Sequence, residues 1–211
     1  MDKGNDDMTA AAFWDKIAPK YAKRPVDDVP AYEETLDRTR SFLHQNDRIL
    51  EIGCGTGSTA LLLGPSVQHV TATDISPQMI AIAQGKLADG PDNITFQQAT
   101  ALSPLAGAPY DAICGFNILH LLGDLPRVLA HLKSSVKPGG FVITKTPCLG
   151  EMNVGLRVIV RLMQLVGKAP YVNSFTIKEL EAAFKKAGFD LVETGHFTTH
   201  TSNRFIVARR P

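Results

Sequence analysis

The sequence lacks several features that would have assigned a class of protein at once. No apolar run approaches the roughly 20 residues that a membrane-spanning helix needs, and the acidic N-terminus shows no signal peptide. Lys and Arg (22) nearly balance Asp and Glu (21), so the concentrated positive charge of a nucleic-acid-binding protein is missing. Cys54, Cys114 and Cys148 lie far apart without C-x-x-C spacing, and no metal-ligand cluster is evident. We therefore expect a cytoplasmic protein with reduced thiols and no metal.

What is present is the composition of one globular domain. The chain has 211 residues, 44% apolar and 20% charged, which is enough for a single core over residues 1–211. Short apolar runs alternate with amphipathic segments. We expect strands at 48–52, 67–74, 94–98, 110–117, 141–145, from 192, and 203–208. We expect helices at 8–18, ended by Pro19, and at 31–44, 59–63, 77–87, 125–132, 154–166 and 176–187.

Residues 49–60 are the most informative stretch, because a buried strand runs directly into alternating glycines. Gly53, Gly55 and Gly57 can adopt positive φ and leave room for a ligand close to the backbone. A helix follows, and its free N–H groups suit an anionic group. The stretch therefore predicts a ligand-binding turn between the first strand and the next helix.

Three other residues of this stretch narrow the choice of ligand. Thr56 or Ser58 would cap the helix, but Ser58 stands where the dinucleotide fingerprint G-x-G-x-x-G needs glycine. Glu51 at the strand end would repel a pyrophosphate and tolerate an ammonium group. The pattern acid-x-G-x-G-x-G resembles motif I of the class I S-adenosylmethionine-dependent methyltransferases. The resemblance implies that Glu51, Thr56 and the three glycines bind S-adenosyl-L-methionine; an ordinary strand-to-helix turn is the alternative.

A second motif lies about 20 residues beyond the first glycine. Asp74 ends the second strand, where a carboxylate can accept hydrogen bonds from both ribose hydroxyls, and Ser76-Pro77 begins a helix. The string from Thr73 to Ala83 is similar to the family's second signature. It implies that Asp74 binds ribose, that Ile75 faces adenine and that Met79 belongs to the cofactor site. For Asp74, a helix-capping or loop aspartate is the alternative.

After the third strand the chain departs from the family pattern. It has Ala99-Thr100 where the family often has Gly-Asp. Thr100 offers a hydroxyl without a charge. We therefore expect Thr100 and the backbone of Ala101 and Leu102 to contact the adenine.

Residues 110–122 resemble the family's fourth strand, with its closing Leu-His. Ligands of parallel sheets bind beyond the carboxyl ends of the strands, where the strand order reverses. Phe116, Asn117 and His120 therefore fall near the sulfonium and its methyl group. His120 is a catalytic candidate, and a packing histidine is the alternative, because the sequence shows no catalytic partner.

Residues 13–21 resemble the N-terminal extension of small-molecule methyltransferases, which implies that 8–44 folds over the cofactor and acceptor sites. Tyr21 is then the second catalytic candidate. The alternative is that Trp14 and Tyr21 pack this helix onto the domain.

Residues 147–175 are the most individual part. The helix predicted at 154–166 is apolar on more than one face, so it should cover something. We expect a lid over the acceptor pocket, which Tyr171 and Asn173 would also line. A homodimer surface and a membrane-grazing helix are the rival interpretations.

The resemblance covers about residues 13–208, including Lys-Pro-Gly-Gly before the fifth strand. It implies a Rossmann-like α/β three-layer sandwich. Its seven-stranded, mostly parallel sheet has the order 3-2-1-4-5-7-6, with the last strand antiparallel. It also implies methyl transfer from S-adenosyl-L-methionine to a small, partly apolar molecule by in-line displacement, leaving S-adenosyl-L-homocysteine. An NAD(P)-dependent oxidoreductase and a non-catalytic S-adenosylmethionine-binding regulator stay open as alternatives.

Overall fold

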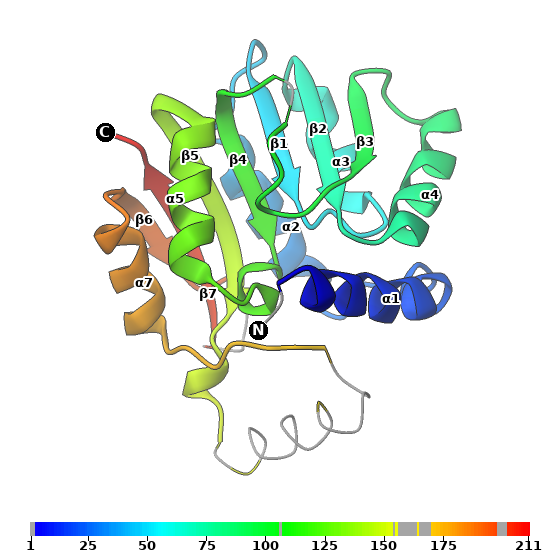
Figure 1. Cartoon of the computed structure of the whole chain (residues 1–211). Coiled ribbons are helices and arrows are strands. Elements are labelled where there is room, and N and C mark those ends of the chain that lie inside the picture. Colours follow the sequence, from blue (N-terminus) through cyan, green and yellow to red (C-terminus); the bar gives the residue numbers. More distant parts are fainter. Residues whose placement is uncertain (1–2, 106, 154, 156–163, 165–169, 198–201) are drawn as a thin grey trace.

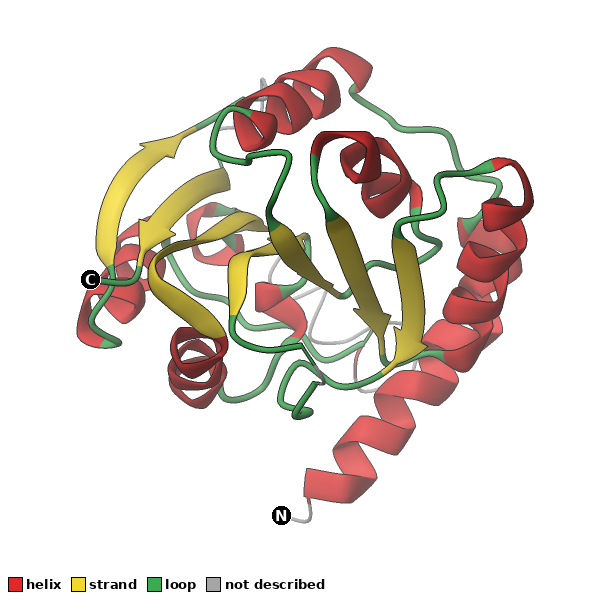
Figure 2. Cartoon of the chain, turned by 90° about the horizontal axis from the view of Figure 1, so that it is seen from above, coloured by secondary structure: helices red, strands yellow, loops and turns green. Residues whose placement is uncertain are grey.

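The computed structural model describes residues 3–105, 107–153, 155, 164, 170–197 and 202–211. They form one seven-stranded sheet with helices on both faces (Figures 1 and 2). In spatial order the strands are β3 (Ile94–Gln98), β2 (His69–Asp74), β1 (Arg48–Ile52), β4 (Tyr110–Phe116), β5 (Val136–Pro147), β7 (Asn203–Arg209) and β6 (Asp190–Gly195). The first five are parallel, and β7 runs antiparallel to β5 and β6. The predicted fold class and strand order are confirmed.

The helices divide between the two faces. They are α1 (Lys3–Tyr21), α2 (Val29–Arg40), α3 (Ser58–Leu63), α4 (Pro77–Gly85), α5 (Leu125–Ser135) and α7 (Ile177–Lys186), with short 3₁₀ turns η1 (Gly64–Ser66), η2 (Lys86–Asp89), η3 (Leu119–Leu121) and η4 (Leu149–Glu151). Successive strand residues point to opposite faces. Ile49 packs with residues of α2, α3 and α4, whereas Leu50 packs with residues of α5 and α7. We call these the α2 face and the α5 face.

The strand order places the candidate site at one edge of the sheet. β1 lies between β2 and β4, so the connections on its two sides turn opposite ways. The parallel strands all end at the same edge, here called the carboxyl edge. Figure 1 shows α1 and the segment 170–176 lying along this edge. Residues that follow β1, β2 and β4 therefore meet there.

α1 departs from the prediction at both ends. It begins earlier, at Lys3, and runs through Pro19 to Tyr21 instead of stopping at Ala18. Proline removes one hydrogen-bond donor. The next turn survives nevertheless, because Ala22 N–H donates to Ala18 O at 2.9 Å. Tyr21 is consequently held on the helix.

α2 is shorter than the predicted 31–44. Asp28 Oδ1 accepts a hydrogen bond from Ala31 N–H at 3.1 Å, and this cap starts the helix earlier. After Arg40 the chain tightens, as Leu43 N–H donates to Arg40 O at 3.0 Å. The amphipathic pattern continues through this turn, which explains the error.

β5 is longer than the predicted 141–145. Residues 137–140, Lys-Pro-Gly-Gly, have the composition of a sharp return between helix and strand. Instead the chain is already extended at Val136, which pairs with Tyr110, and an irregular register and φ of +79° at Gly139 absorb the bend. β1 and β3 match the prediction at both ends, and β2, β4, β6 and β7 differ from it by at most two residues at an end.

The region between β5 and α7 is described only in part. The helix predicted at 154–166 lies outside the described residues except for 155 and 164. The returning segment 170–176 is tied to the domain, because Asn173 N–H donates to His120 O at 2.6 Å. α7 then begins with a capping box between Thr176 and Glu179, whose T-x-x-E spacing is visible in the sequence. Within the described ranges, no helix is both long and apolar enough to cross a membrane.

Candidate active site

The three glycines after β1 serve different purposes. All have positive φ, of +64°, +54° and +78° at Gly53, Gly55 and Gly57. A Cβ at Gly53 would lie 2.6 Å from the Ile118 side chain, and one at Gly57 would lie 2.6 Å from the Phe96 ring. A Cβ at Gly55 would meet only the Tyr21 ring, at 3.7 Å. Gly53 and Gly57 therefore permit close packing, and Gly55 is the position with space in front of the backbone.

The expected helix cap is wrong. Gly57, in the left-handed region, stands at the N-cap of α3, and no side chain caps this helix. Thr56 and Ser58 instead accept hydrogen bonds from Lys86, whose Nζ lies 3.2 Å from Thr56 Oγ1 and 3.1 Å from Ser58 Oγ. Lys86 also donates to Thr56 O at 2.8 Å. Gly57 lies so close to Phe96 that only glycine fits at this N-cap position. The sequence spacing of Thr56 and Ser58 did not reveal this contact.

Glu51 is a buried acid with a free oxygen. It lies on β1 with 2% of its surface exposed, and no described residue donates a hydrogen bond to its Oε2. Burial, and secondly the charge of Asp74, raise the pKa of Glu51 to about 8. The side chain is thus mostly protonated at neutral pH. A cationic group beside it would restore the carboxylate.

Asp74 is held by backbone on both of its oxygens. Its Oδ2 accepts from Gly55 N–H and its Oδ1 from Ser76 N–H, each at 2.9 Å. Burial raises the pKa of Asp74, although these hydrogen bonds lower it. Each oxygen keeps a further lone pair. The loop-anchoring alternative is therefore realised, while the ribose role stays a prediction.

The residues after Asp74 differ in how far they reach a ligand. Ser76 caps α4 as predicted, since its Oγ accepts from Met79 N–H at 3.1 Å. Met79 itself is 2% exposed. Ile75 is half-buried, and its carbonyl accepts from Gln98 Nε2 at 3.1 Å. Ile75 is the better placed of the two predicted residues to touch a ligand.

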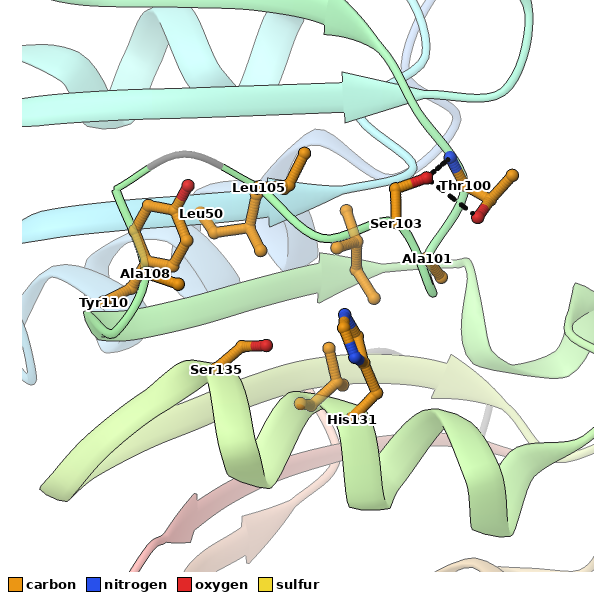
Figure 3. A pocket seen from close by; sticks show the side chains of 11 residues that line it. Leu50, Thr100, Ala101, Ser103, Leu105, Ala108, Tyr110, His131 and Ser135 are labelled. Carbon is orange, nitrogen blue, oxygen red and sulfur yellow. Dashed lines mark hydrogen bonds between the residues drawn. The ribbon is translucent and has the colours of Figure 1, made fainter.

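The loop after β3 uses its own hydroxyls. Thr100 Oγ1 accepts from Leu102 N–H at 3.2 Å and shares a hydrogen bond with Ser103 Oγ at 3.1 Å. Figure 3 shows that Thr100 and Ala101 also line a pocket whose far wall is α5, with His131 facing them. Leu50 lines it as well, so the pocket lies on the α5 face. No sequence pattern indicated that α5 would form this wall.

Asn117 stands directly after β4 in an unusual conformation. Its φ is +56°, and it is the one described non-glycine residue with positive φ. Its N–H donates to Lys145 O at 2.8 Å. Such backbone outliers often mark functional sites. Phe116 precedes it and packs on the α2 face, and Ile118 follows and fills the space above Gly53.

His120 is a half-buried imidazole that is uncharged at neutral pH. It lies on η3, and its Nδ1 has no hydrogen-bond partner among the described residues. Burial lowers the pKa of His120 to about 4. The neighbouring Asn173 fixes the backbone here, donating from its N–H to His120 O and from Nδ2 to Leu122 O. If His120 serves only to pack, its Nδ1 keeps no hydrogen-bond partner among the described residues.

Tyr21 packs against Trp14 of α1 and also lies over the glycine turn, while its catalytic role stays a prediction. Trp14 packs edge-on against Tyr21, with centroids 6.3 Å apart. Tyr21 is nevertheless 45% exposed and lies over Gly55. Burial raises its pKa most, Arg24 lowers it and Asp74 raises it. The sequence analysis missed Asp15 on the same helix, which accepts hydrogen bonds from Ser76 and Gln78.

This fold and site define the class of protein. A parallel sheet whose order reverses at β1, with an acid-tipped glycine turn and an acid ending β2, is the architecture of a Rossmann-like nucleoside-binding enzyme. A sequence model of the family described as "Methyltransferase domain" matches residues 22–194. The chain therefore belongs to the class I S-adenosylmethionine-dependent methyltransferases.

Curated relatives share part of this chain. It is 33% identical over 126 residues to the hybrid PKS-NRPS synthetase lepA of Aspergillus flavus. The matched stretch makes up 54% of this chain and 3% of the synthetase. It is 27% identical over 158 residues to the 27-O-demethylrifamycin SV methyltransferase of Amycolatopsis mediterranei, which covers 70% of this chain and 56% of that enzyme. The chain thus spans a small part of the first relative's length and about half of the second's.

Solved structures share the fold. The methyltransferase in complex with the Trm112 activator of Haloferax volcanii gives a TM-score of 0.74 at 14% identity, covering 94% of this chain and 97% of that one. Phosphoethanolamine N-methyltransferase 2 of Haemonchus contortus, solved with S-adenosylhomocysteine, gives 0.71 at 17% identity, covering 85% and 53%. S-adenosyl-L-methionine is the cofactor of the family. The Glu51 oxygen that has no partner among the described residues, together with the open face of Gly55, fits its ammonium end.

Proposed function

We propose that this chain methylates a small, partly apolar molecule. The observation that carries the proposal is the buried oxygen of Glu51, which has no partner in the described residues and lies at a glycine turn. A buried acid without a partner calls for a ligand that supplies a donor. The ammonium group of S-adenosylmethionine supplies both a donor and a positive charge, whereas a dinucleotide brings negative phosphates.

The proposed cofactor residues contact different parts of the ligand. Glu51 holds the ammonium, Gly55 lets the amino-acid part lie against the backbone, and Asp74 accepts from the ribose hydroxyls with its remaining lone pairs. The other proposed cofactor residues are Gly53, Thr56, Gly57, Ile75, Met79, Thr100, Ala101, Leu102, Phe116 and Asn117. Bound S-adenosylmethionine supplies a methyl group on a sulfonium, ready for in-line displacement by an acceptor atom.

His120 and Tyr21 are the proposed catalytic residues. Because His120 is neutral, its Nδ1 is free to accept a hydrogen bond from an acceptor hydroxyl or amine and then its proton. Tyr21 covers Gly55 from the side of α1, so that it excludes water from the ligand. The remaining task of the protein is to align the acceptor, and positioning of this kind contributes about 7–11 kcal/mol at best.

A partly apolar acceptor suits the surroundings of His120. Leu119 is fully buried, Leu122 is half-buried, and His120 adds no charge at neutral pH. The names of the relatives, which include polyketide synthases and a demethylrifamycin methyltransferase, point to acceptors of this kind. We further propose that 8–44 covers the cofactor and that 147–175 forms a lid within the domain. The anchoring of 170–176 beside η3 supports the lid.

The test is a labelled-methyl transfer screen over partly apolar hydroxyl- and amine-bearing metabolites. Thermal shift with S-adenosylhomocysteine and with NADH comes first. We expect stabilisation by S-adenosylhomocysteine only, followed by label transfer that Glu51→Ala abolishes. Stabilisation by NADH instead would mean an oxidoreductase. Binding of S-adenosylhomocysteine without transfer to any acceptor would mean a regulator.

A further inference from the structure

α1 reaches the candidate cofactor site at two points. Near its end, the Tyr21 ring lies 3.7 Å from the place of a Cβ on Gly55. Earlier on the helix, Asp15 reaches the start of α4. The two residues are six positions apart, about 9 Å along a helix. α1 thus lies along the carboxyl edge, below β2, β3 and α4, as Figure 1 shows.

The contact at Asp15 is a charge-assisted cap. Its Oδ1 accepts from Ser76 Oγ–H at 2.5 Å and from Gln78 N–H at 3.1 Å. Ser76 is fully buried, so water does not compete for its hydroxyl. A carboxylate at the first turn of a helix also meets the positive end of the helix dipole. Asp15 therefore attaches α1 to α4 through donors that α4 cannot satisfy internally.

Ser76 connects this contact to the glycine turn. Its hydroxyl donates to Asp15, while its own N–H donates to Asp74 Oδ1 at 2.9 Å. Asp74 Oδ2 in turn accepts from Gly55 N–H at 2.9 Å. A continuous line of hydrogen bonds thus runs from α1 to the turn after β1. The third residue of this line, Asp74, carries the carboxylate that we assign to the ribose.

We propose that Asp15 is a positioning residue that fastens α1 to the cofactor site, so that docking of α1 and binding of S-adenosylmethionine stabilise each other. The inference rests on the proposed function, since it takes Asp74 as a ligand-binding residue. A ligand on Asp74 restrains the loop that carries Ser76, and this restrains the partner of Asp15. A docked α1 in turn keeps Tyr21 over Gly55. Coupling of this kind is reciprocal.

The first experiment measures the affinity for S-adenosylhomocysteine by calorimetry, well below the melting temperature. Asp15→Ala should bind on the order of tenfold more weakly, because it loses hydrogen bonds to a charged group. Asp15→Asn keeps an oxygen that accepts the same hydrogen bonds and should restore most of the affinity. Lys16→Ala, at the exposed neighbouring position, is the matched control and should bind like the wild type.

The second experiment tests the coupling itself by hydrogen exchange. S-adenosylhomocysteine should slow exchange of the α1 amides around residues 12–21 in the wild type and in Lys16→Ala. It should not do so in Asp15→Ala. Ser76→Ala should lose this ligand-induced slowing as Asp15→Ala does, and the double variant should lose no more of it, since both remove the Ser76–Asp15 hydrogen bond. Ser76→Ala also removes the cap of α4, so its overall stability is measured separately.

The outcomes separate the two proposals. If the wild type fails to bind S-adenosylhomocysteine, the proposed function fails. If it binds and Asp15→Ala binds equally well, the role of Asp15 is overturned while the function stands. Should Asp15→Ala fail to fold, the wild-type exchange data decide, because unchanged exchange of α1 on ligand binding also overturns the coupling.

Discussion

The two sides of the carboxyl edge are built differently. On the side of β1 and β2, the proposed ligand-binding groups are backbone and short side chains in a turn whose conformation its own residues set, as positive φ at Gly55 illustrates. On the side of β4 and β5, His120 is held by a segment more than fifty positions later, through Asn173. The first half carries a pattern that a family shares. The second half depends on contacts between distant parts of the chain.

The largest expected effect concerns the side of β4 and β5, which we call the acceptor half. His120→Ala should lower the rate of methyl transfer on the order of a hundredfold to a thousandfold, because the acceptor loses its proton-accepting partner. The affinity for S-adenosylhomocysteine should stay within about twofold, since His120 lies outside the proposed cofactor contacts. Steady-state kinetics and calorimetry measure the two quantities. His44→Ala, exposed after α2, is the control. An equal loss of rate and affinity would contradict the division of roles.

The next effect concerns stability in the cofactor half. Gly57→Ala should lower the free energy of unfolding by about 2–4 kcal/mol, because its Cβ would strike Phe96 and the positive φ is strained. Gly55→Ala has open space and should cost about 1–2 kcal/mol from strain alone, yet weaken cofactor binding more. Urea unfolding of both variants tests this. Equal stability losses would show that the glycines are interchangeable.

A smaller effect is expected at the acid that ends β2. Asp74→Ala should weaken binding of S-adenosylhomocysteine by tens-fold, since the ribose loses its acceptor and the turn loses its anchor at Gly55. Asp74→Asn keeps one side-chain oxygen, so its affinity should lie between those of the wild type and Asp74→Ala. Calorimetry on folded protein, checked by circular dichroism, gives the answer. Unchanged binding would remove Asp74 from the site.

The smallest effect is a pH dependence at Glu51. Its pKa of about 8 in the free protein means that, below that pH, binding an ammonium group must displace a proton. Affinity for S-adenosylhomocysteine should therefore fall on the order of twentyfold from about pH 7.5 to about pH 6, with proton release approaching one per ligand at the lower pH. Glu51→Gln should bind more weakly but without this slope. Because the pKa of Asp74 is also raised, Asp74→Asn shows whether the slope belongs to Glu51. A slope that survives in Glu51→Gln would be decisive against the assignment.

The sequence predicted what local chemistry and a shared pattern determine. It gave the strands, the glycine turn, the Ser76 cap and the capping box of α7, each of which is set by residues within a few positions of one another. The resemblance supplied the strand order. The errors arose where distant residues decide. Gly57 displaced Thr56 and Ser58 as cap because Phe96 packs against it.

Asp15 shows the limit most clearly. Its partner Ser76 lies 61 positions away, so no spacing rule connects them. The same holds for Ile118, which explains Gly53 only once β1 and β4 are neighbours. Contacts between residues so far apart in the sequence can be recognised only in the folded structure.

β7 lies between β5 and β6 and pairs with both, although it follows both in the sequence. During synthesis on the ribosome, one edge of β5 therefore waits without its partner until residue 209 has emerged. An exposed strand edge of this kind is where nascent chains pair with each other. A ribosome that stalls after β6 would hold an aggregation-prone polypeptide whose glycine turn and Asp74 have already been made.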